Sequence, residues 1–135
     1  MVKLIVGLKG SGKTKQLIEM VNSAINTSNG AVVCLEAGNK LRYDIKYQAR
    51  LIDTSEYMVC DAQSLFGFVA GVFASNHDIT DLFIDSALKI CGNDLPSFEK
   101  FVQEASAFAE KNGINLVMTS SVEPEKVPDS LKKFL

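Results

Sequence analysis

A glycine-rich segment near the first residue carries the clearest chemistry in this sequence. It fits the pattern G-x-x-x-x-G-K-[ST] at every fixed position and consists of Gly7, Leu8, Lys9, Gly10, Ser11, Gly12, Lys13 and Thr14. Loops of this pattern surround phosphate oxygens with backbone N–H groups and lead into the amino end of a helix, which also favours negative charge. We expect Lys13 to reach the β- and γ-phosphates of a nucleotide and the Thr14 hydroxyl to bind Mg²⁺.

The pattern requires a strand before the loop and a helix after it, and both are predicted. Residues 3–6 are an apolar run typical of a buried strand. Behind the loop, apolar residues recur at helical spacing: Leu17, Ile18, Val21, Ala24 and Ile25. A glycine-rich turn that contains Gly-Lys-Thr by chance is the alternative, and it leaves these flanks unexplained. The sequence therefore predicts a site for a nucleoside triphosphate.

Asp85 is a second candidate, at the end of the apolar strand predicted over residues 81–85. Ligands of parallel α/β sheets gather at the carboxyl ends of the strands. A carboxylate there can hold a metal-bound water beside Thr14. Asp81 begins the same strand and so belongs at the wrong end. The alternative role for Asp85 is to cap the next turn.

Other polar groups are expected at strand ends. Glu36 closes an apolar run, so its carboxylate can orient or deprotonate a water that attacks the γ-phosphate. Asp85 is followed by Ser86 rather than by a second acid, which leaves Glu36 for this role. A surface loop position is the alternative for Glu36. The last predicted strand ends in three hydroxyls that either contact the γ-phosphate or terminate the strand: Thr119, Ser120 and Ser121.

Strands and helices are predicted to alternate along the chain. Five strands are expected, over residues 3–6, 31–36, 56–60, 81–85 and 114–119. Further helices are expected over residues 45–52, after Asp61, between Asp94 and Gly113, and after Pro128. This alternation predicts an α/β fold, a parallel sheet with helices on both faces. Two glycines in the helix after Asp61 are expected to permit close packing on the sheet: Gly67 and Gly71.

Length and composition fit a single domain over residues 1–135, with 47% hydrophobic and 22% charged residues. The net charge of −2, with Arg only at positions 42 and 50, gives no clear nucleic-acid signature. No apolar run is long enough to span a membrane. Met1 leads directly into the first strand, without a signal peptide. Three cysteines without a C-x-x-C pair suggest a reducing, cytoplasmic compartment and no zinc site.

Together the motifs resemble those of the RecA-like ATPases, the group that includes RecA, the hexameric replicative helicases and KaiC. The resemblance rests on the stretches GLKGSGKT, AVVCLE, YMVCD and LFIDSAL, in that order. It implies a P-loop NTPase core, a three-layer sandwich, with ATP and Mg²⁺ as ligands. It further implies that Glu36 activates water and that Ser121 senses the γ-phosphate. In strand order, residues 114–119 would separate strand 3–6 from strand 81–85, with the other two strands farther out.

The resemblance also implies a site completed at a subunit boundary, so a homo-oligomer or a protein partner is expected. RecA-like cores continue the sheet beyond the phosphate-loop strand, whereas this chain ends in a segment with Pro124 and Pro128. Because proline cannot donate to a sheet ladder, we expect the tail, residues 130–135, or a second subunit to cover that edge.

Other functions are weighed against an ATPase. The main alternative is a binding module in which nucleotide switches conformation or assembly with little turnover. A thymidine-kinase-like nucleoside kinase is disfavoured because that family has Asp-Glu where this chain has Asp85-Ser86, and a zinc lasso that this chain lacks. A GTPase is disfavoured because residues 39–42 lack the Asp of the N/T-K-x-D motif.

Overall fold

The first strand, the glycine-rich loop and the first helix follow one another as predicted. The computed structural model describes every residue from Met1 to Leu135. Strand β1 (Val2–Gly7) runs into a tight turn, and helix α1 (Lys13–Thr27) begins directly after it. Gly12, the residue before the helix, has a left-handed backbone with φ of 88°, which glycine adopts without steric cost. The local sequence thus determines both the loop and the direction of α1.

Five parallel strands form one sheet in the order β1-β5-β4-β2-β3. The other four strands are β2 (Ala31–Glu36), β3 (Arg50–Asp53), β4 (Ile79–Ile84) and β5 (Asn115–Ser121). Strand β5 therefore lies between β1 and β4, as the resemblance implied. Its register places Ser121 opposite Gly7, at the end of the sheet where the loop begins.

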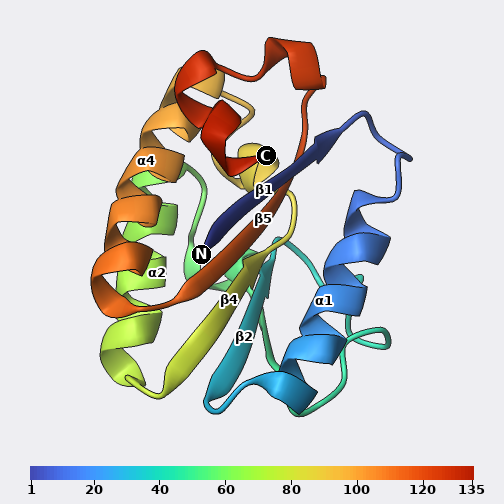
Figure 1. The fold of residues 1–135 in the computed structure, drawn as a ribbon, viewed down its shortest axis with the longest axis vertical. Helices are drawn as coiled ribbons and strands as arrows, with labels where there is room; N and C mark the ends of the chain where they lie inside the picture. The colour runs from blue at the N-terminus through green and yellow to red at the C-terminus, as the bar shows by residue number, and fades with distance from the viewer.

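Helices cover both faces of this sheet (Figure 1). Helix α1 packs on one face, and α2 (Ala62–Ser75) and α4 (Leu95–Asn112) lie on the other, while the short α3 (Ala87–Ile90) follows β4. Each face has its own apolar core. Leu17 and Val21 of α1 belong to the smaller core, and Phe98 and Phe101 of α4 belong to the larger one. The fold is an α/β fold with a parallel sheet between two helical layers.

The predicted helix over residues 45–52 is wrong. The chain forms turns as far as Ala49 and then enters β3. Leu41, Ile45 and Ala49 are buried at every fourth position, a spacing that imitates a helical face. The end of the segment becomes a strand because Leu51 and Ile52 pair with β2, a contact that local sequence does not reveal.

The predicted strand over residues 56–60 is also wrong. These residues fall in a 3-10 helix, η1 (Thr54–Tyr57), and the loop after it. Asp53 starts the turn by accepting the Ser55 N–H at 3.0 Å, and Met58 ends it with a left-handed φ of 62°. The sheet still has five strands because β3 takes the outermost place.

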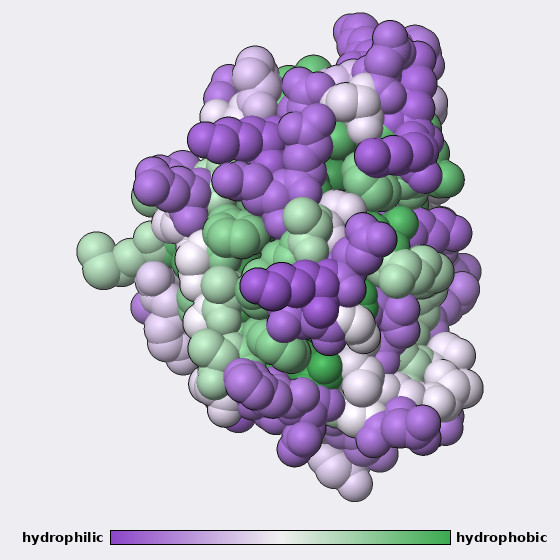
Figure 2. Space-filling model, turned by 60° about the vertical axis from the view of Figure 1, so that its left-hand side comes forward, coloured by the Kyte–Doolittle hydropathy of each residue, from purple (hydrophilic) through white to green (hydrophobic).

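Helix α2 begins as predicted but packs differently. Asp61 caps it by accepting the Ser64 N–H at 2.8 Å. Gly67 and Gly71 are exposed, and a Cβ added to either would meet no atom within 4 Å. The expectation that they permit close packing on the sheet is therefore wrong, because both lie on the outward side. Figure 2 turns the side with α2 and α4 forward and shows apolar surface between hydrophilic side chains.

The tail contains two 3-10 helices, η2 (Pro124–Lys126) and η3 (Asp129–Phe134). Val127 and Leu131 are buried in the larger core, and η3 packs against β1 and α4. The tail thus contacts the first strand within a single chain, and whether a second subunit also covers its edge stays a prediction. A membrane-crossing segment is not found among the helices, since none combines the required length with the required apolar character.

Candidate functional site

A pocket of about 670 Å³ lies at the carboxyl ends of the strands, against the glycine-rich loop. Five residues that the sequence analysis singled out contribute to its lining, from four separate segments: Lys13, Thr14, Glu36, Asp85 and Ser121. Lys9, Gly10 and Gly12 of the loop line it as well, while Gly7, Leu8 and Ser11 form the rest of the loop. Parallel strand pairing is what brings these distant positions together.

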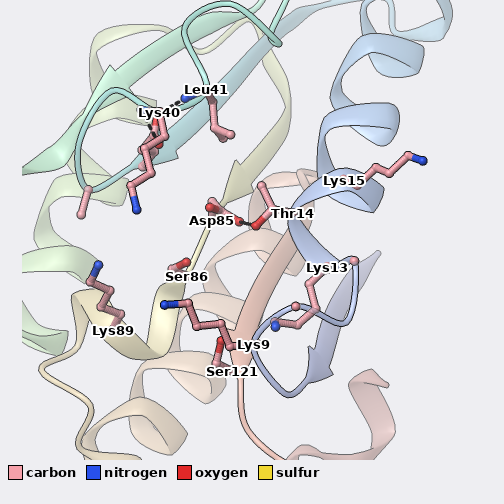
Figure 3. Close-up of a pocket in the computed structure, with 14 residues that line it drawn as sticks. Lys9, Lys13, Thr14, Lys15, Lys40, Leu41, Asp85, Ser86, Lys89 and Ser121 are labelled. Atoms are coloured by element: carbon pink, nitrogen blue, oxygen red, sulfur yellow. Dashed lines mark hydrogen bonds between the residues drawn. The ribbon is translucent and has the colours of Figure 1, made fainter.

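The loop is folded tightly on itself. A Cβ at Gly7 would stand 2.5 Å from the Ser11 hydroxyl oxygen, so a larger residue there would have to displace the Ser11 side chain. The Ser11 N–H donates to the Leu8 carbonyl at 3.1 Å. Lys13 is largely buried, and its Nζ donates to the same carbonyl at 3.0 Å. Figure 3 shows the Lys13 side chain beside the loop. The Lys13 ammonium is thereby held over the loop.

A hydroxyl–carboxylate network connects the loop to β4 and β5. The Thr14 hydroxyl donates to Asp85 Oδ1 at 3.2 Å (Figure 3), and the Thr119 hydroxyl donates to the same oxygen at 2.7 Å. Thr119 Oγ1 also accepts the Ser86 N–H at 2.8 Å. Hydroxyl and carboxylate oxygens are the ligands that Mg²⁺ prefers, so the residues present at Thr14 and Asp85 fit this ion.

The alternatives considered for Asp85 find no support in its contacts. Helix α3 begins after Ser86 without any side-chain cap, so Asp85 does not cap the following turn. Asp81 lies at the other end of β4, where its carboxylate accepts from the side chains of Thr80 and Asn115. Of the two carboxylates, only Asp85 meets the loop.

The three hydroxyls at the end of β5 have three different environments. Thr119 faces Asp85, as described. Ser120 is fully buried, where its Oγ accepts the Leu88 N–H at 3.2 Å and donates to the Thr119 carbonyl. Ser121 is exposed and lines the pocket. The sequence did not predict the hydrogen bond between Thr119 and Asp85, because this bond forms only when β5 lies beside β4.

Glu36 lines the pocket but is bound to the backbone of the following turn. The residue is only 3% exposed, and its carboxylate accepts the Lys40 N–H at 2.9 Å and the Leu41 N–H at 3.2 Å. Burial raises the pKa of Glu36 above its ordinary value of 4.5; the two N–H donors lower it, and the charges of Asp85 and Asp53 raise it further. Glu36 therefore anchors the turn at residues 37–41 as well as facing the site.

Lysines give the pocket its positive charge. Lys9, Lys40 and Lys89 extend from three segments toward the same space, while Lys15 points away (Figure 3). None of them pairs with a carboxylate, since both salt bridges of the chain lie in the tail. Lys89 was not foreseen, although its place within one turn of Asp85 was a usable signal. Together with Lys13 these ammonium groups outnumber the two carboxylates, which favours a polyanionic ligand.

Cys34, near the site, has a poorly reactive thiol. Burial, with the charges of Asp85 and Glu36 as further causes, raises the pKa of Cys34 to about 12. Burial likewise raises the pKa of Cys91 to about 12. Both thiols are protonated at neutral pH, and a protonated thiol is a poor nucleophile.

Neither a scan against protein-family models nor a search of curated proteins found a match for this chain.

Proposed function

We propose that this protein is a Mg²⁺-dependent ATPase with a minimal RecA-like core. The observation that carries the proposal is the hydrogen bond between Thr14 and Asp85, in a pocket lined by the glycine-rich loop and by unpaired lysines. In P-loop NTPases the metal ion is held by the Ser or Thr of the loop and by an Asp at the end of another strand, and Thr14 and Asp85 have these residue types. The position of β5 between β1 and β4 supports the RecA-like assignment.

The loop and the lysines bind and orient the triphosphate. Backbone N–H groups of the loop and the amino end of α1 face the phosphates, and Lys13 moves from the Leu8 carbonyl to a phosphate oxygen. Lys9, Lys40 and Lys89 offset further negative charge at the open side of the pocket. Ser121 lies at the end of β5, where its hydroxyl contacts the terminal phosphate.

Thr14 and Asp85 hold the metal, and Thr119 fixes the Asp85 carboxylate through the shared oxygen. Mg²⁺ held there would supply positive charge that offsets the negative charge of the phosphates during transfer of the terminal phosphoryl group. Hydroxyl donors suit this arrangement because Thr14 can rotate its proton away from Asp85 and offer an oxygen lone pair.

Glu36 is the base that orients the attacking water. Its buried carboxylate has a raised pKa, which brings it closer to the working pH of a general base. Each of its oxygens accepts one backbone N–H and keeps a second lone pair for water.

A nucleotide-dependent switch is the second candidate. The same two backbone contacts favour it, because Glu36 is tied to residues 37–41 and is restrained from moving onto a substrate water. In this case turnover is slow, and the bound γ-phosphate acts on the turn through Glu36.

Thermal unfolding with and without Mg-ATP tests the binding step. At about 100 times its dissociation constant, Mg-ATP stabilises the fold by roughly 2.7 kcal/mol, a rise in melting temperature of about 10 °C for a domain of this size. Lys13→Ala abolishes the rise, whereas Lys100→Ala, an exposed lysine on α4, leaves it unchanged. A rise that persists in Lys13→Ala contradicts the proposed site.

Phosphate release by the same preparations separates the two candidates. An ATPase releases phosphate in a Mg²⁺-dependent reaction that Lys13→Ala eliminates. Stabilisation by Mg-ATP with no catalytic phosphate release identifies the switch instead.

A further inference from the structure

Lys89 is the exposed residue of α3, the short helix that follows β4. The other residues of this helix, Ala87, Leu88 and Ile90, are buried in the larger core. The Lys89 side chain lines the same pocket as the glycine-rich loop. Helix α3 therefore directs one cation into the pocket from a buried support.

The backbone that leads to Lys89 is held by the neighbouring strand β5. The Ser86 N–H donates to the Thr119 hydroxyl oxygen at 2.8 Å, and the Leu88 N–H donates to the Ser120 hydroxyl oxygen at 3.2 Å. Both acceptor residues are buried, so these bonds are shielded from water. A side chain on such a support is positioned more precisely than one on a loop.

Ser86 turns the chain sharply between Asp85 and α3. Its backbone is left-handed, with φ of 57° and ψ of 48°, a conformation that only glycine adopts without steric cost. Backbone conformations of this kind are concentrated at functional sites. Because of the turn, α3 begins directly after the candidate metal-binding carboxylate, and Lys89 remains at the carboxyl end of β4.

The pocket holds cations on two sides of Asp85. In the view of Figure 3, the side chains of Lys9, Lys40 and Lys89 end on one side of Asp85, whereas Lys13 lies on the other. Lys9 and Lys40 extend from loops, and Lys89 alone of the three extends from a helix. Of the lysines across from Lys13, Lys89 is thus the one with the most fixed support.

We infer that Lys89 is a catalytic residue that stabilises the transferred phosphoryl group from within the same chain. The inference rests on the proposed ATPase function and adds one residue to its reaction. Negative charge spreads over the non-bridging oxygens of the γ-phosphate in the transition state, and a cation placed beside them accelerates the transfer. The resemblance to RecA-like ATPases implied a site completed by a second subunit. With Lys89 in place, turnover requires no second copy.

The reaction is balanced with Lys89 acting only as a hydrogen-bond donor. The oxygen of a water molecule forms a bond to the γ-phosphorus while the bond from this phosphorus to the β–γ bridging oxygen breaks. ADP leaves with the electron pair of the broken bond. Glu36 accepts the water proton, whereas the Lys89 ammonium keeps its protons, so its charge is present throughout the transfer.

Steady-state phosphate release and thermal unfolding test the inference together. Lys89→Ala should lower kcat about 100-fold, while the rise in melting temperature with Mg-ATP stays as in the wild type. Lys89→Arg should retain most of kcat because the charge remains. Lys40→Ala should raise KM more than it lowers kcat. Lys100→Ala on α4 is the control and should change neither constant, and all four side chains are exposed.

Mg-ADP with aluminium fluoride, an analogue of the transferred phosphoryl group, gives a measurement that does not require turnover. Transition-state analogues bind more tightly than substrates because they meet contacts made only in the transition state. Lys89→Ala should bind this analogue about 100-fold more weakly than the wild type and should bind Mg-ADP alone equally well. An equal loss of affinity for both ligands would make Lys89 a general phosphate-binding residue and would overturn the inference.

Mixing Lys13→Ala with Lys89→Ala distinguishes action within one chain from action across a subunit boundary. If Lys89 acted on a neighbouring chain, the mixture would regain activity, because an intact loop could meet an intact Lys89. No gain is expected, and a gain overturns the inference. An unchanged kcat in Lys89→Ala also overturns it but leaves the ATPase proposal standing. A wild type that neither releases phosphate nor binds the fluoride analogue more tightly than Mg-ADP contradicts both.

Discussion

Glu36 and Asp85 lie in the same pocket but are held by different kinds of donor. Asp85 accepts only hydroxyl groups, from Thr14 and Thr119. Glu36 accepts only backbone N–H groups. A hydroxyl can rotate and become a metal ligand itself, whereas a backbone N–H remains a donor. Asp85 is thus able to exchange its partners for a metal ion, while Glu36 remains tied to its turn.

Asp85→Asn is expected to reduce the dependence on Mg²⁺ without disturbing the fold. The amide oxygen can still accept from Thr14 and Thr119, so only the charge is lost. Titration of the ATP-induced rise in melting temperature against Mg²⁺ should show a midpoint shifted roughly tenfold upward, equivalent to about 1.4 kcal/mol. Thr119→Val keeps the charge of Asp85 but removes the hydrogen bond from the Thr119 hydroxyl. This variant should shift the Mg²⁺ midpoint less. An unchanged midpoint in Asp85→Asn would place the metal elsewhere.

Glu36 is expected to make the folded chain less stable as the pH rises above 4.5. Burial raises the pKa of Glu36 in the folded state, so the folded chain binds this proton more readily than the unfolded chain. The stability from this group is present below the unfolded pKa and is lost as the pH rises through the folded pKa. Urea denaturation between about pH 4.5 and 8 should show this loss in the wild type and not in Glu36→Gln.

The diagnostic quantity is the change of the free energy of unfolding with pH, because Glu36→Gln also alters the hydrogen bonds to the turn at residues 37–41. Glutamine has one acceptor oxygen for two N–H donors, so a lower stability at every pH is expected and is not diagnostic. Glu110→Gln, at an exposed α4 position, is the control and should keep the wild-type pH profile. If the profiles of Glu36→Gln and the wild type are parallel, the carboxylate titrates alike in the folded and unfolded chains.

At the scale of elements, two short segments without long helices contribute buried apolar residues to the two cores of the sheet. The turns of residues 37–49 close the α1 side of the sheet with Leu41, Ile45 and Ala49. The tail closes the opposite side, where Val127 and Leu131 join the larger core. Both segments lack long helices and both carry buried apolar residues, so their contribution to stability comes from packing rather than from helix propensity.

Loss of the tail is expected to destabilise the sheet at β1. Truncation after Val127 removes Leu131, which is fully buried, and η3, which packs against β1. The milder change Leu131→Ala should lower the free energy of unfolding by roughly 2–5 kcal/mol, and the truncation by at least as much or with aggregation through β1. Lys133→Ala, exposed on the same 3-10 helix, is the control in urea denaturation. A truncated chain that melts like the wild type would show that β1 is protected by other contacts.

At the scale of the whole molecule, the sequence predicted what depends on local pattern. The loop, α1, the caps at Asp61 and Asp94, and the strand before Asp85 all follow from spacing and residue type within a short window. Strand β3 does not follow from local pattern, because its extended conformation depends on pairing with β2. The role of Thr119 was missed for the same reason, since its hydrogen bond to Asp85 depends on β5 lying beside β4.

The strand order also determines when the phosphate-binding loop can form during synthesis. Of the five strands β1 is synthesised first, yet its only partner in the sheet is β5, where Val2 pairs with Leu116. At translation rates of about 5–20 residues per second, β1 waits roughly 6–23 s for that partner. The middle of the sheet can pair in the meantime, from β2 to β4. If the pocket binds nucleotide as proposed, the ligand cannot assist the folding steps that precede pairing of β1 with β5.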